Sequence, residues 1–548
     1  MIGRTSLLGR PQEAVPALAS STQEQSRAQK RKGEQSSEDS WAKQRQREKT
    51  VRIWLSAEPA HLNPFDEPDA STLRVVEDTV FESLFVLEPG ADGHGRIVPR
   101  LVADYRVAAD RREIRLQLQE RAKFHDGRPL SAVDVQFSVD TARSAARRST
   151  RLGRMLAPVL GVEMLGSREV RIRMSRPSWY VLRALAELPI LPAHVYGQGK
   201  GVDDWRHARS PIGSGPFRLS EWESGTRIVL SRNDAYWGSP PAIERIELVL
   251  ENNAAKALVR ARLEEIDILP ELIPQHYPDQ PATPTLAASY VPLELRPPQL
   301  AYLLVNVRRP PFSDWRVRQA AWLLIDRQRI SDEVYKAMAR PIVGPVWPGG
   351  PVDAATPRLA PDSASLALSL LEQAGWRDLD GDGVREQGTE KLRLALLVLA
   401  SAPRDQERAL ILGFLRAGGF QVEQRPGESA VLLNRLRKGE FDAALVSWRG
   451  RTDDDMSPFL HSRGSENWGG FTSPDIDRAL TALELAWGPD ERLEKGKELG
   501  ELLLAACPFL SLHAPEPHGL VHRRVQGLTV FDGWFALRNL SLLPGTNP

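Results

Sequence analysis

The chain has 548 residues, 41% of them hydrophobic and 26% charged, which is the composition of an ordinary globular protein with a buried core. Its 72 basic and 71 acidic residues leave a net charge of +1, so nothing favours binding to nucleic acid or to an anionic membrane surface. Cys507 is the only cysteine, which excludes an intramolecular disulfide and a cysteine-ligated metal cluster. We find no apolar run long enough to cross a bilayer.

Residues 1–50 form a polar leader that we expect to be disordered. From Ser20 to Thr50 the chain is rich in Gln, Ser, Lys, Arg and Glu, with Trp41 as its only aromatic residue, so it offers too little apolar surface to fold alone. A secretory signal needs an apolar core of about 7–15 residues behind a basic start. The apolar residues near the start are too few and too interrupted for such a core, so the sequence as written shows no export signal.

Folded sequence begins at Val51, where residues 51–55 alternate like a strand. The next periodic segment, 69–84, predicts an amphipathic helix, because apolar residues recur along one stripe. Residues 113–118 alternate cleanly and predict a strand with one face in the core. Ser131 with Asp134 three residues later resembles a capping box and predicts the start of another helix.

The stretch that says most about function is 441–448, a nearly continuous apolar run that ends at Trp448. Such a run predicts a strand covered on both faces. The loop that follows, 449–455, carries charges of both signs. Because ligands of open α/β sheets bind in the crevice beyond the carboxyl ends of strands, Trp448 and this loop form a candidate binding site. The alternative is a core tryptophan followed by a solvated turn.

Several short motifs, in order along the chain, resemble the family 5 extracellular solute-binding proteins, which are the dipeptide, oligopeptide and nickel binders that feed ABC importers. The resemblance covers about residues 51–540, and each motif alone is weak. The motifs lie at 56–59, 62–64, 123–138, 211–217, 232–237, 302–306, 310–320, 374–376, 380–383 and 469–471.

The resemblance implies an α/β fold of two lobes, the type II periplasmic-binding-protein-like fold, with an extra inserted domain and a hinge cleft between the lobes. On this pattern residues 51–78, 188–289 and 501–548 form lobe I, 79–187 form the inserted domain, and 290–500 form lobe II. Two crossing strands are expected to join the lobes. The proline-rich stretch 270–298 fits an interlobe connection.

Function in such a fold is closure of a hinge on a solute. The resemblance implies that Trp448 lines the cleft, because peptide-binding members have a tryptophan at this position. Many members place an aspartate three residues later, where it pairs with the amino terminus of the peptide. Here that position is Arg451, whose charge would repel an ammonium group. Either Asp453, Asp454 and Asp455 take over the ammonium in a shifted loop register, or Arg451 itself receives an anionic or carboxylate-bearing solute.

Three more residues complete the predicted ligand-binding set. Arg404, near the end of the strand expected at 392–399, is placed to meet a carboxylate. Glu58 and Asn306 belong to two of the family motifs, and we expect them at the cleft for that reason. The predicted ligand is a peptide or a peptide-like small solute, and the alternative is a non-peptide anionic solute.

We predict no metal site and no cofactor. Residues 378–383 begin like a calcium loop, but the twelfth position is Thr389, where a bidentate glutamate belongs. His513, His518 and His522 have no cysteine or carboxylate at zinc spacing.

We also predict that the chain is not an enzyme, because no set of nucleophile, base and orienting group can be named. Since no phosphate-binding P-loop is present, the ATPase and the membrane permease must be other chains. The predicted protein is a monomer of the periplasm or cell envelope that binds a solute and no nucleic acid. The alternative is an intracellular solute-sensing module.

Overall fold

The computed structural model describes residues 49–66, 68–90, 95–199, 201–343, 363–399 and 405–543. Residues 51–543 form one compact unit. Among the described residues, no helix combines the length and the apolar character that a membrane crossing requires. The leader that we expect to be disordered lies, except for residues 49 and 50, outside the described residues.

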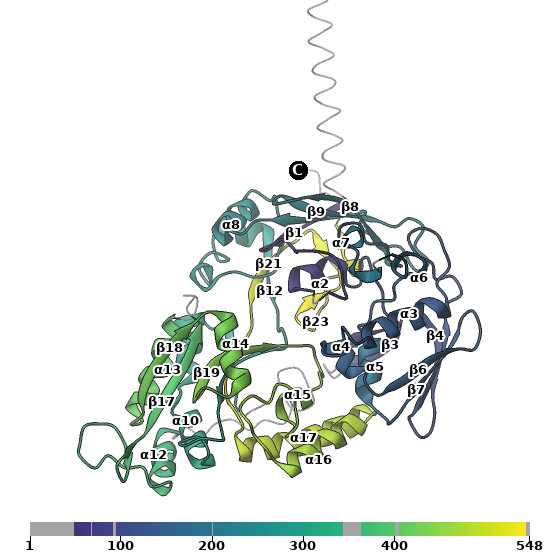
Figure 1. Cartoon of the computed structure of the whole chain (residues 1–548). Coiled ribbons are helices and arrows are strands. Elements are labelled where there is room, and N and C mark those ends of the chain that lie inside the picture. The colour runs from purple at the N-terminus through teal and green to yellow at the C-terminus, as the bar shows by residue number, and fades with distance from the viewer. Residues whose placement is uncertain are drawn as a thin grey trace, which may run out of the picture. The chain divides into compact units, whose positions relative to one another are not determined.

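The first large sheet has seven strands in the order β12-β21-β11-β1-β10-β9-β8 (Figure 1). Its strands are β1 (Thr50–Leu55), β8 (Phe217–Glu223), β9 (Arg227–Arg232), β10 (Arg245–Leu250), β11 (Ile268–Leu269), β12 (Tyr290–Glu294) and β21 (His518–His522). The strand expected at 51–55 is confirmed as β1, which pairs in parallel with β11. The helices beside it are α2 (Ala70–Val76), α8 (Ala254–Arg262) and α9 (Pro284–Ser289).

Helix α2 is shorter than the helix predicted over 69–84. It starts after Asp69, whose carboxylate accepts a hydrogen bond from the backbone N–H of Thr72 at 2.7 Å. It ends at Val76, because Glu77 is extended and Asp78 has a φ of +55°. The apolar residues further along the predicted stripe are buried all the same, but they reach the core from a turn.

A four-stranded sheet, β4-β5-β7-β6, is inserted in the sequence between β1 and β8. Its strands are β4 (Val102–Val107), β5 (Glu113–Leu118), β6 (Val159–Met164) and β7 (Glu169–Met174), and its helices are α3 (Ala132–Arg143), α4 (Arg151–Met155) and α5 (Trp179–Leu185). Alternate residues of β5 are buried, as predicted. The capping box of Ser131 and Asp134 at the start of α3 is confirmed.

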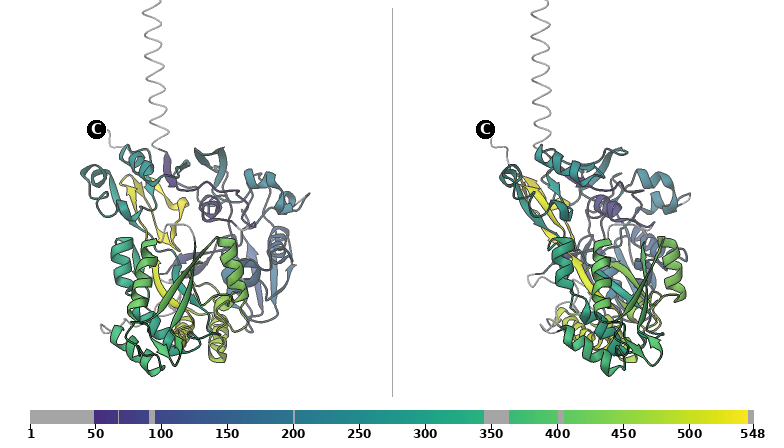
Figure 2. Two further views of the ribbon diagram at one scale, coloured as in Figure 1. Left: turned by 60° about the vertical axis from the view of Figure 1, so that its left-hand side comes forward. Right: turned by 90° about the vertical axis from the view of Figure 1, so that its left-hand side faces the viewer.

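The third large sheet has six strands in the order β14-β20-β13-β19-β17-β18. Its strands are β13 (Gln299–Val305), β14 (Ala339–Pro341), β17 (Arg393–Leu399), β18 (Gln421–Gly427), β19 (Ala443–Arg449) and β20 (Leu510–Pro515). Helices cover both of its faces (Figure 2): α10 (Trp315–Leu324), α11 (Arg327–Tyr335), α12 (Ser363–Gln373), α13 (Asp405–Ala417), α14 (Ser429–Lys438), α15 (Ser457–Leu460), α16 (Pro474–Leu485) and α17 (Pro489–Ala506).

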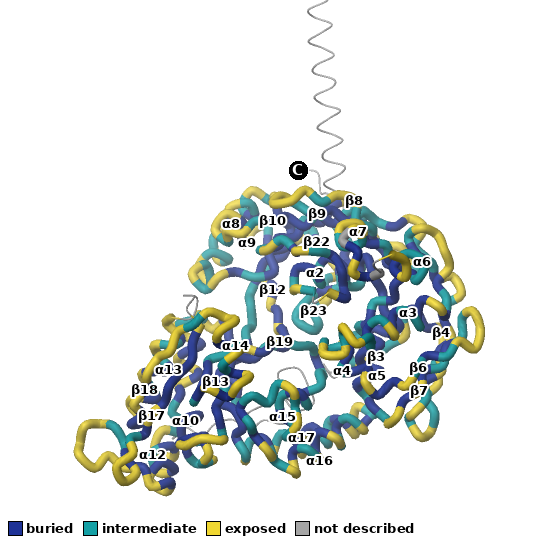
Figure 3. Tube along the Cα trace, viewed as in Figure 1, coloured by how far each residue is buried: buried dark blue, intermediate teal, exposed yellow. Residues whose placement is uncertain are grey.

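Strand β19 confirms the predicted apolar strand, at 443–449, and both of its faces are covered at its start, whereas Ser447 is exposed. Ala443 packs in the core shared with α10, α12 and α13. Ala444 packs in a separate cluster with residues of α14, and Trp448 packs in a cluster with residues of α16 and α17. Buried residues follow the strands of the sheets, while exposed residues gather on helices and loops at the periphery (Figure 3).

The chain passes between the seven-stranded and six-stranded sheets at 295–298, from β12 to β13, and at 516–517, from β20 to β21. The two segments lie side by side, because the N–H of Leu295 donates to the carbonyl oxygen of Pro517 at 2.9 Å. The predicted connection 270–298 is therefore mostly folded, and only its last residues cross between the sheets.

Sheet membership corrects the predicted lobe boundaries at two places. Strand β12 belongs to the seven-stranded sheet, although residues 290–500 were assigned to lobe II. Strand β20 belongs to the six-stranded sheet, although 501–548 were assigned to lobe I. Both differ because backbone pairing, which the apolar pattern of a strand does not specify, decides which sheet it joins. The rest of the division stays a prediction.

The remaining elements are short. They are β2 (Phe85–Pro89), β3 (Gly95–Pro99), β15 (Glu386–Gln387), β16 (Glu390–Lys391), β22 (Val525–Gln526), β23 (Val530–Phe531), β24 (Trp534–Phe535), β25 (Ser541–Leu542), α6 (Ala193–Tyr196), α7 (Trp205–Arg209) and the 3₁₀ turns η1 (Gly201–Asp203), η2 (Pro274–His276) and η5 (Leu537–Asn539).

Candidate functional site

Two adjoining cavities lie at the carboxyl end of β19. The first, of about 710 Å³, runs along β17 and β19, and the second, of about 890 Å³, is lined by residues of α2, α4 and the segment 529–539. Arg151, Arg154 and Arg449 line both cavities. We call the two cavities together the cleft. The residues that line the cleft come from segments near each of the three large sheets, and they meet where the sequence predicts a binding site.

Trp448 is both a wall of the cleft and part of the core. Its side chain is 8% exposed, lines the first cavity and packs edge-to-face on Phe459, with ring centroids 6.3 Å apart. The indole also lies over the backbone of Gly450, where an added Cβ would stand 2.0 Å from the ring. Only glycine leaves room for the ring at this position.

Arg451 lines the second cavity but is occupied by the protein's own acids. Its guanidinium group donates to Glu77 at 2.5 Å and to Asp532 at 3.2 Å. The backbone N–H of Thr452 also donates to Asp532, at 2.5 Å. Burial alone would lower the pKa of Arg451, but Glu77, Glu187 and Asp532 raise it well above its usual value. Arg451 is therefore a charged residue with internal counter-ions.

Asp454 belongs to a second group of ion pairs that lines both cavities. Its carboxylate accepts from Arg151 at 2.7 and 2.8 Å, and Arg151 also pairs with Glu187. Arg183, which is fully buried, pairs with Glu187 and donates to the carbonyl oxygen of Thr452 at 3.1 Å. Burial would raise the pKa of Glu187, but Arg151 and Arg183 lower it well below its usual range.

Asp453 turns away from the cleft and lines neither cavity. It accepts from the indole N–H of Trp179 at 3.0 Å and from Nε of Arg492 at 2.9 Å. The guanidinium group of Arg492 also lies 4.8 Å from the ring of Trp179. Asp453 thus connects α17 to α5 and has no free oxygen facing the solute.

Two other predicted ligand contacts have structural partners instead. Asn306 is 1% exposed, and its Nδ2 donates to the carbonyl oxygens of Gly439 and Phe441, both at 3.0 Å. Glu58 accepts from the indole of Trp222 at 2.7 Å and from the backbone N–H of Gly225 at 2.9 Å. Neither side chain lines the cleft, so we propose neither as a ligand contact. Arg404 lies outside the described residues.

Sequence reasoning missed Arg74 of α2, which lines the second cavity beside Arg449 of β19, a residue of the predicted charged loop. The guanidinium group of Arg74 lies 4.2 Å from the ring of Trp534. Burial lowers the pKa of Arg74, Glu271 opposes the shift, and the positive charge of Arg449 adds to it. Within the described part of the chain, neither arginine has a hydrogen bond or an ion pair through its side chain. The sequence names Arg449 as the first residue of the charged loop after Trp448, but no local sequence pattern predicts that Arg74 lines the cavity.

The carboxylates that line the cleft are, by contrast, partnered by groups of the protein. Glu77 and Asp532 have Arg451, Glu187 and Asp454 have Arg151, and Glu466 has Arg154. Asp78 pairs with Arg538, and Glu88 pairs with Arg100. Glu82 accepts a hydrogen bond from Tyr236, and Asp455 accepts one from the backbone N–H of Ser457. Arginines hold seven of these carboxylates, while Glu82 and Asp455 accept hydrogen bonds from neutral groups. Arg74 and Arg449 have no ion pair among the described residues, which suits a solute with a carboxylate or another anionic group.

The family comparison gives a match over most of the chain. The family model described as "Bacterial extracellular solute-binding proteins, family 5 Middle" matches residues 96–470. The oligopeptide-binding protein AppA of Bacillus subtilis (strain 168) is 24% identical over 430 residues, 75% of this chain and 77% of that protein. The di/tripeptide-binding protein 2 of Pseudomonas aeruginosa (strain UCBPP-PA14) is 24% identical over 508 residues, 87% of this chain and 92% of that protein.

Solved structures agree in fold. AppA from Bacillus subtilis, in complex with a nonapeptide, has a TM-score of 0.72 at 20% identity and covers 90% of this chain and 99% of its own. NikA from Brucella suis, in complex with Fe(III)-EDTA, has a TM-score of 0.77 at 20% identity and covers 90% of this chain and all of its own. These likenesses confirm the predicted fold class.

Proposed function

Because the chain belongs to the bacterial extracellular solute-binding proteins of family 5, we propose that it is the solute receptor of an ABC importer. The solute enters the cleft and is delivered to a membrane permease that is a separate chain, in the periplasm or cell envelope. Each cavity of the cleft is of the size that proteins use for small molecules, about 300–1,000 Å³. Relatives named for oligopeptides and di- and tripeptides support a peptide or peptide-like solute.

The observation that carries the proposal is the pair Arg74 and Arg449, which have no ion pair among the described residues, in a cleft where most acids pair with arginines of the protein. A guanidinium group binds a carboxylate through two parallel hydrogen bonds, and Arg74 already lies over Trp534. The carboxylate end of the solute belongs beside these two residues, and Trp448 supplies an apolar wall in the adjoining cavity.

Within the described loop 449–454, no acid is free for the ammonium end of a peptide, because Asp453 and Asp454 are paired with arginines. Arg451 stands where an acid would be needed, and Glu77 and Asp532 already hold that arginine. Asp454 is held by Arg151 in the same way. Recognition therefore rests on the carboxylate, and the same observation favours a second candidate, a non-peptide anionic solute.

Isothermal titration calorimetry of the full chain tests this with four solutes: trialanine, its N-acetyl form, its C-terminal amide and glutarate. The N-acetyl peptide should bind at least as well as trialanine, and the amide at least tenfold more weakly. Binding of glutarate alone would support the anionic, non-peptide candidate. Equal binding of trialanine and its amide would contradict the role of the two arginines.

Two variants sharpen the test. Arg449→Ala should weaken carboxylate binding at least tenfold, while Arg425→Ala, at an exposed arginine of β18 outside the cleft, should leave it unchanged. Trp448→Phe, which keeps an aromatic ring in the core, should weaken binding of the same solute. Unchanged affinity of this variant would remove Trp448 from the site.

A further inference from the structure

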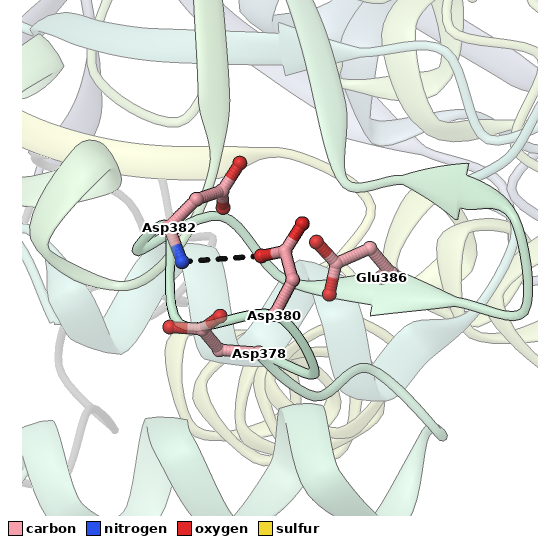
Figure 4. Close-up of side chains that lie close together, drawn as sticks. All are labelled: Asp378, Asp380, Asp382 and Glu386. Carbon is pink, nitrogen blue, oxygen red and sulfur yellow. Dashed lines mark hydrogen bonds between the residues drawn. The ribbon is translucent and has the colours of Figure 1, made fainter.

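A loop that lines neither cavity of the cleft brings four carboxylates together between α12 and the hairpin β15–β16 (Figure 4). One oxygen each of Asp378, Asp380, Asp382 and Glu386 lies within 4.8 Å of the others. The three aspartates are exposed and Glu386 is buried. The function proposed for the cleft does not use this group.

Backbone N–H groups hold the carboxylates in place. Asp378 accepts from the N–H of Gly381 at 2.8 Å and of Gly383 at 3.1 Å, and both glycines have positive φ, +77° and +84°. One oxygen of Asp380 and one of Asp382 accept in the same way from residues two positions later. The second oxygen of each is left without a backbone donor among the described residues.

Glu386 supplies the observation that points to a ligand. It is 7% exposed, and its Oε2 accepts from the N–H of Leu379 at 3.0 Å. Its Oε1 is buried and has no hydrogen-bond partner in the described part of the chain. A buried carboxylate oxygen without a hydrogen bond is costly and uncommon in native proteins. Glu386 points towards Asp380 across the loop (Figure 4).

Lys391 is the one basic side chain with ion pairs to this group among the described residues. Its ammonium pairs with Asp382, and it lies 3.9 Å from Asp380 and 3.8 Å from Oε1 of Glu386, beyond hydrogen-bond distance. The lysine side chain is 30% exposed, so it can swing into solvent. One ammonium against four carboxylates leaves three negative charges uncompensated.

We propose that this loop binds a calcium ion through the four carboxylates, with Lys391 displaced towards solvent. Aspartates at alternate positions followed by glycine match the start of a calcium loop. The sequence predicts no metal because the twelfth residue is Thr389. The fold supplies the missing acid from the ninth residue instead, because Arg377 and Glu386 pair across an isolated bridge that returns the chain to the loop.

Calcium suits the group better than magnesium does. Calcium accepts six to eight oxygen ligands in flexible geometry, whereas magnesium requires a near-ideal octahedron and keeps several waters. A loop of four carboxylates offers the first arrangement. The expected role of the ion is to fix the hairpin β15–β16 to the end of α12.

The test uses the full chain after removal of bound metal by EDTA and desalting. Titration calorimetry should give one calcium per chain with a dissociation constant of about 10⁻⁶–10⁻³ M, and magnesium should bind at least tenfold more weakly. Terbium luminescence sensitised by Trp376, two residues before the loop, gives a second measurement, and calcium should displace the terbium. Absence of calcium binding in both measurements overturns the proposal and leaves Lys391 as the only counter-ion.

Variants locate the ion. Glu386→Gln keeps the acceptor for Leu379 and should weaken calcium binding at least tenfold, as should Asp380→Asn at an exposed position. Lys391→Met should strengthen it, because the competing ammonium is gone. Glu390→Gln removes the same charge one residue away from Lys391, on the exposed side of the hairpin, and should change nothing. If Glu386→Gln and Asp380→Asn bind calcium like the wild type, the ion lies elsewhere and the proposal fails.

Discussion

Glu82 is a carboxylate that is 1% exposed and accepts hydrogen bonds from the side chains of Ser214, Tyr236 and Trp237, at 2.6–3.0 Å. Burial raises its pKa from the ordinary value of 4.5 to about 7, although the hydrogen bonds of Tyr236 and Trp237 oppose the shift. The folded state therefore binds a proton at Glu82 over a pH range in which the unfolded chain has released it.

This makes stability depend on pH in a direction that can be checked. Because the folded pKa lies above the unfolded one, the stabilisation from protonated Glu82 is complete below about pH 4.5 and is lost as the pH rises through 7. The loss amounts to roughly 3 kcal/mol at 1.36 kcal/mol per pKa unit. Glu82→Gln mimics the protonated form and should lack this loss when melting temperatures at pH 5 and pH 8 are compared. Identical pH profiles for variant and wild type would contradict the raised pKa.

Reversing the charge of Arg451 by substitution would affect the stability of the fold as well as the preference for a ligand. From the sequence, Arg451→Asp should favour solutes with a free amino group. In the structure that change would place a third carboxylate beside Glu77 and Asp532, so loss of folding is the expected result. Arg451→Met is the better variant, because it leaves the two acids free without adding another.

Arg451→Met should move binding towards solutes with an ammonium group. Glu77 and Asp532 lose their cation and can receive the amino terminus of a peptide in its place. The ratio of trialanine affinity to N-acetyl-trialanine affinity should rise at least tenfold, together with a lower melting temperature of the free protein. An unchanged ratio in a folded variant would mean that these acids do not face the solute.

At the scale of elements, the motif at 211–217 is explained by a close approach of two backbones. A Cβ on Gly213 would stand 1.9 Å from the carbonyl oxygen of Val80, and one on Gly215 would stand 2.1 Å from that of Thr79. The N–H of Gly215 donates to the carbonyl oxygen of Val80 at 3.0 Å. The glycines thus join the segment before β8 to the turn after α2, on the side of the cleft.

Gly213→Ala should therefore destabilise the protein by more than about 1 kcal/mol, because a backbone carbonyl cannot move away as a flexible side chain can. Gly413→Ala is the matched control, because its Cβ would lie in open space on helix α13. There the same substitution should raise stability slightly, by about 0.5–1 kcal/mol. Chemical denaturation of both variants measures the difference, and equal stabilities would contradict the close approach.

Some helices and strands could be predicted from the sequence, whereas the contacts of the cleft could not. β5, the start of α3 and β19 follow from local patterns, because alternation, capping and apolar runs are properties of neighbouring residues. The contacts of the cleft do not follow in this way: Arg451 meets Glu77 across 374 positions and Asp532 across 81. No pattern in the sequence pairs such residues, so the sequence predicted Trp448 and the charged loop but not the internal ion pairs.

In the whole folded unit, two sets of contacts connect the part of the chain around the six-stranded sheet to the rest. On one side the segments 295–298 and 516–517 cross between two sheets, held by the hydrogen bond of Leu295 to Pro517. On another side, α16 and α17 meet the domain of the four-stranded sheet. The contacts there join Asp453 and Arg492 with Trp179, Glu484 with Ser178 and Arg176, and Arg111 with Glu491. Entry of a solute by hinge motion requires the second set to separate while the crossing segments bend.

Two ion pairs of the second set should differ in their effect on closure. Arg111 and Glu491 are well exposed, so their ion pair contributes little and is screened by salt. Arg492 and Asp453 are largely buried, so removing one partner leaves an uncompensated charge. Asp453→Ala should therefore shift the solute-free protein towards an open state, with a larger radius of gyration in X-ray scattering than the wild type or Arg111→Ala. Solute affinity should fall by the fraction of closed protein that is lost, since the residues that line the cleft come together only in the closed state. Equal radii for Asp453→Ala and Arg111→Ala would mean that the crossing segments alone set the opening of the cleft.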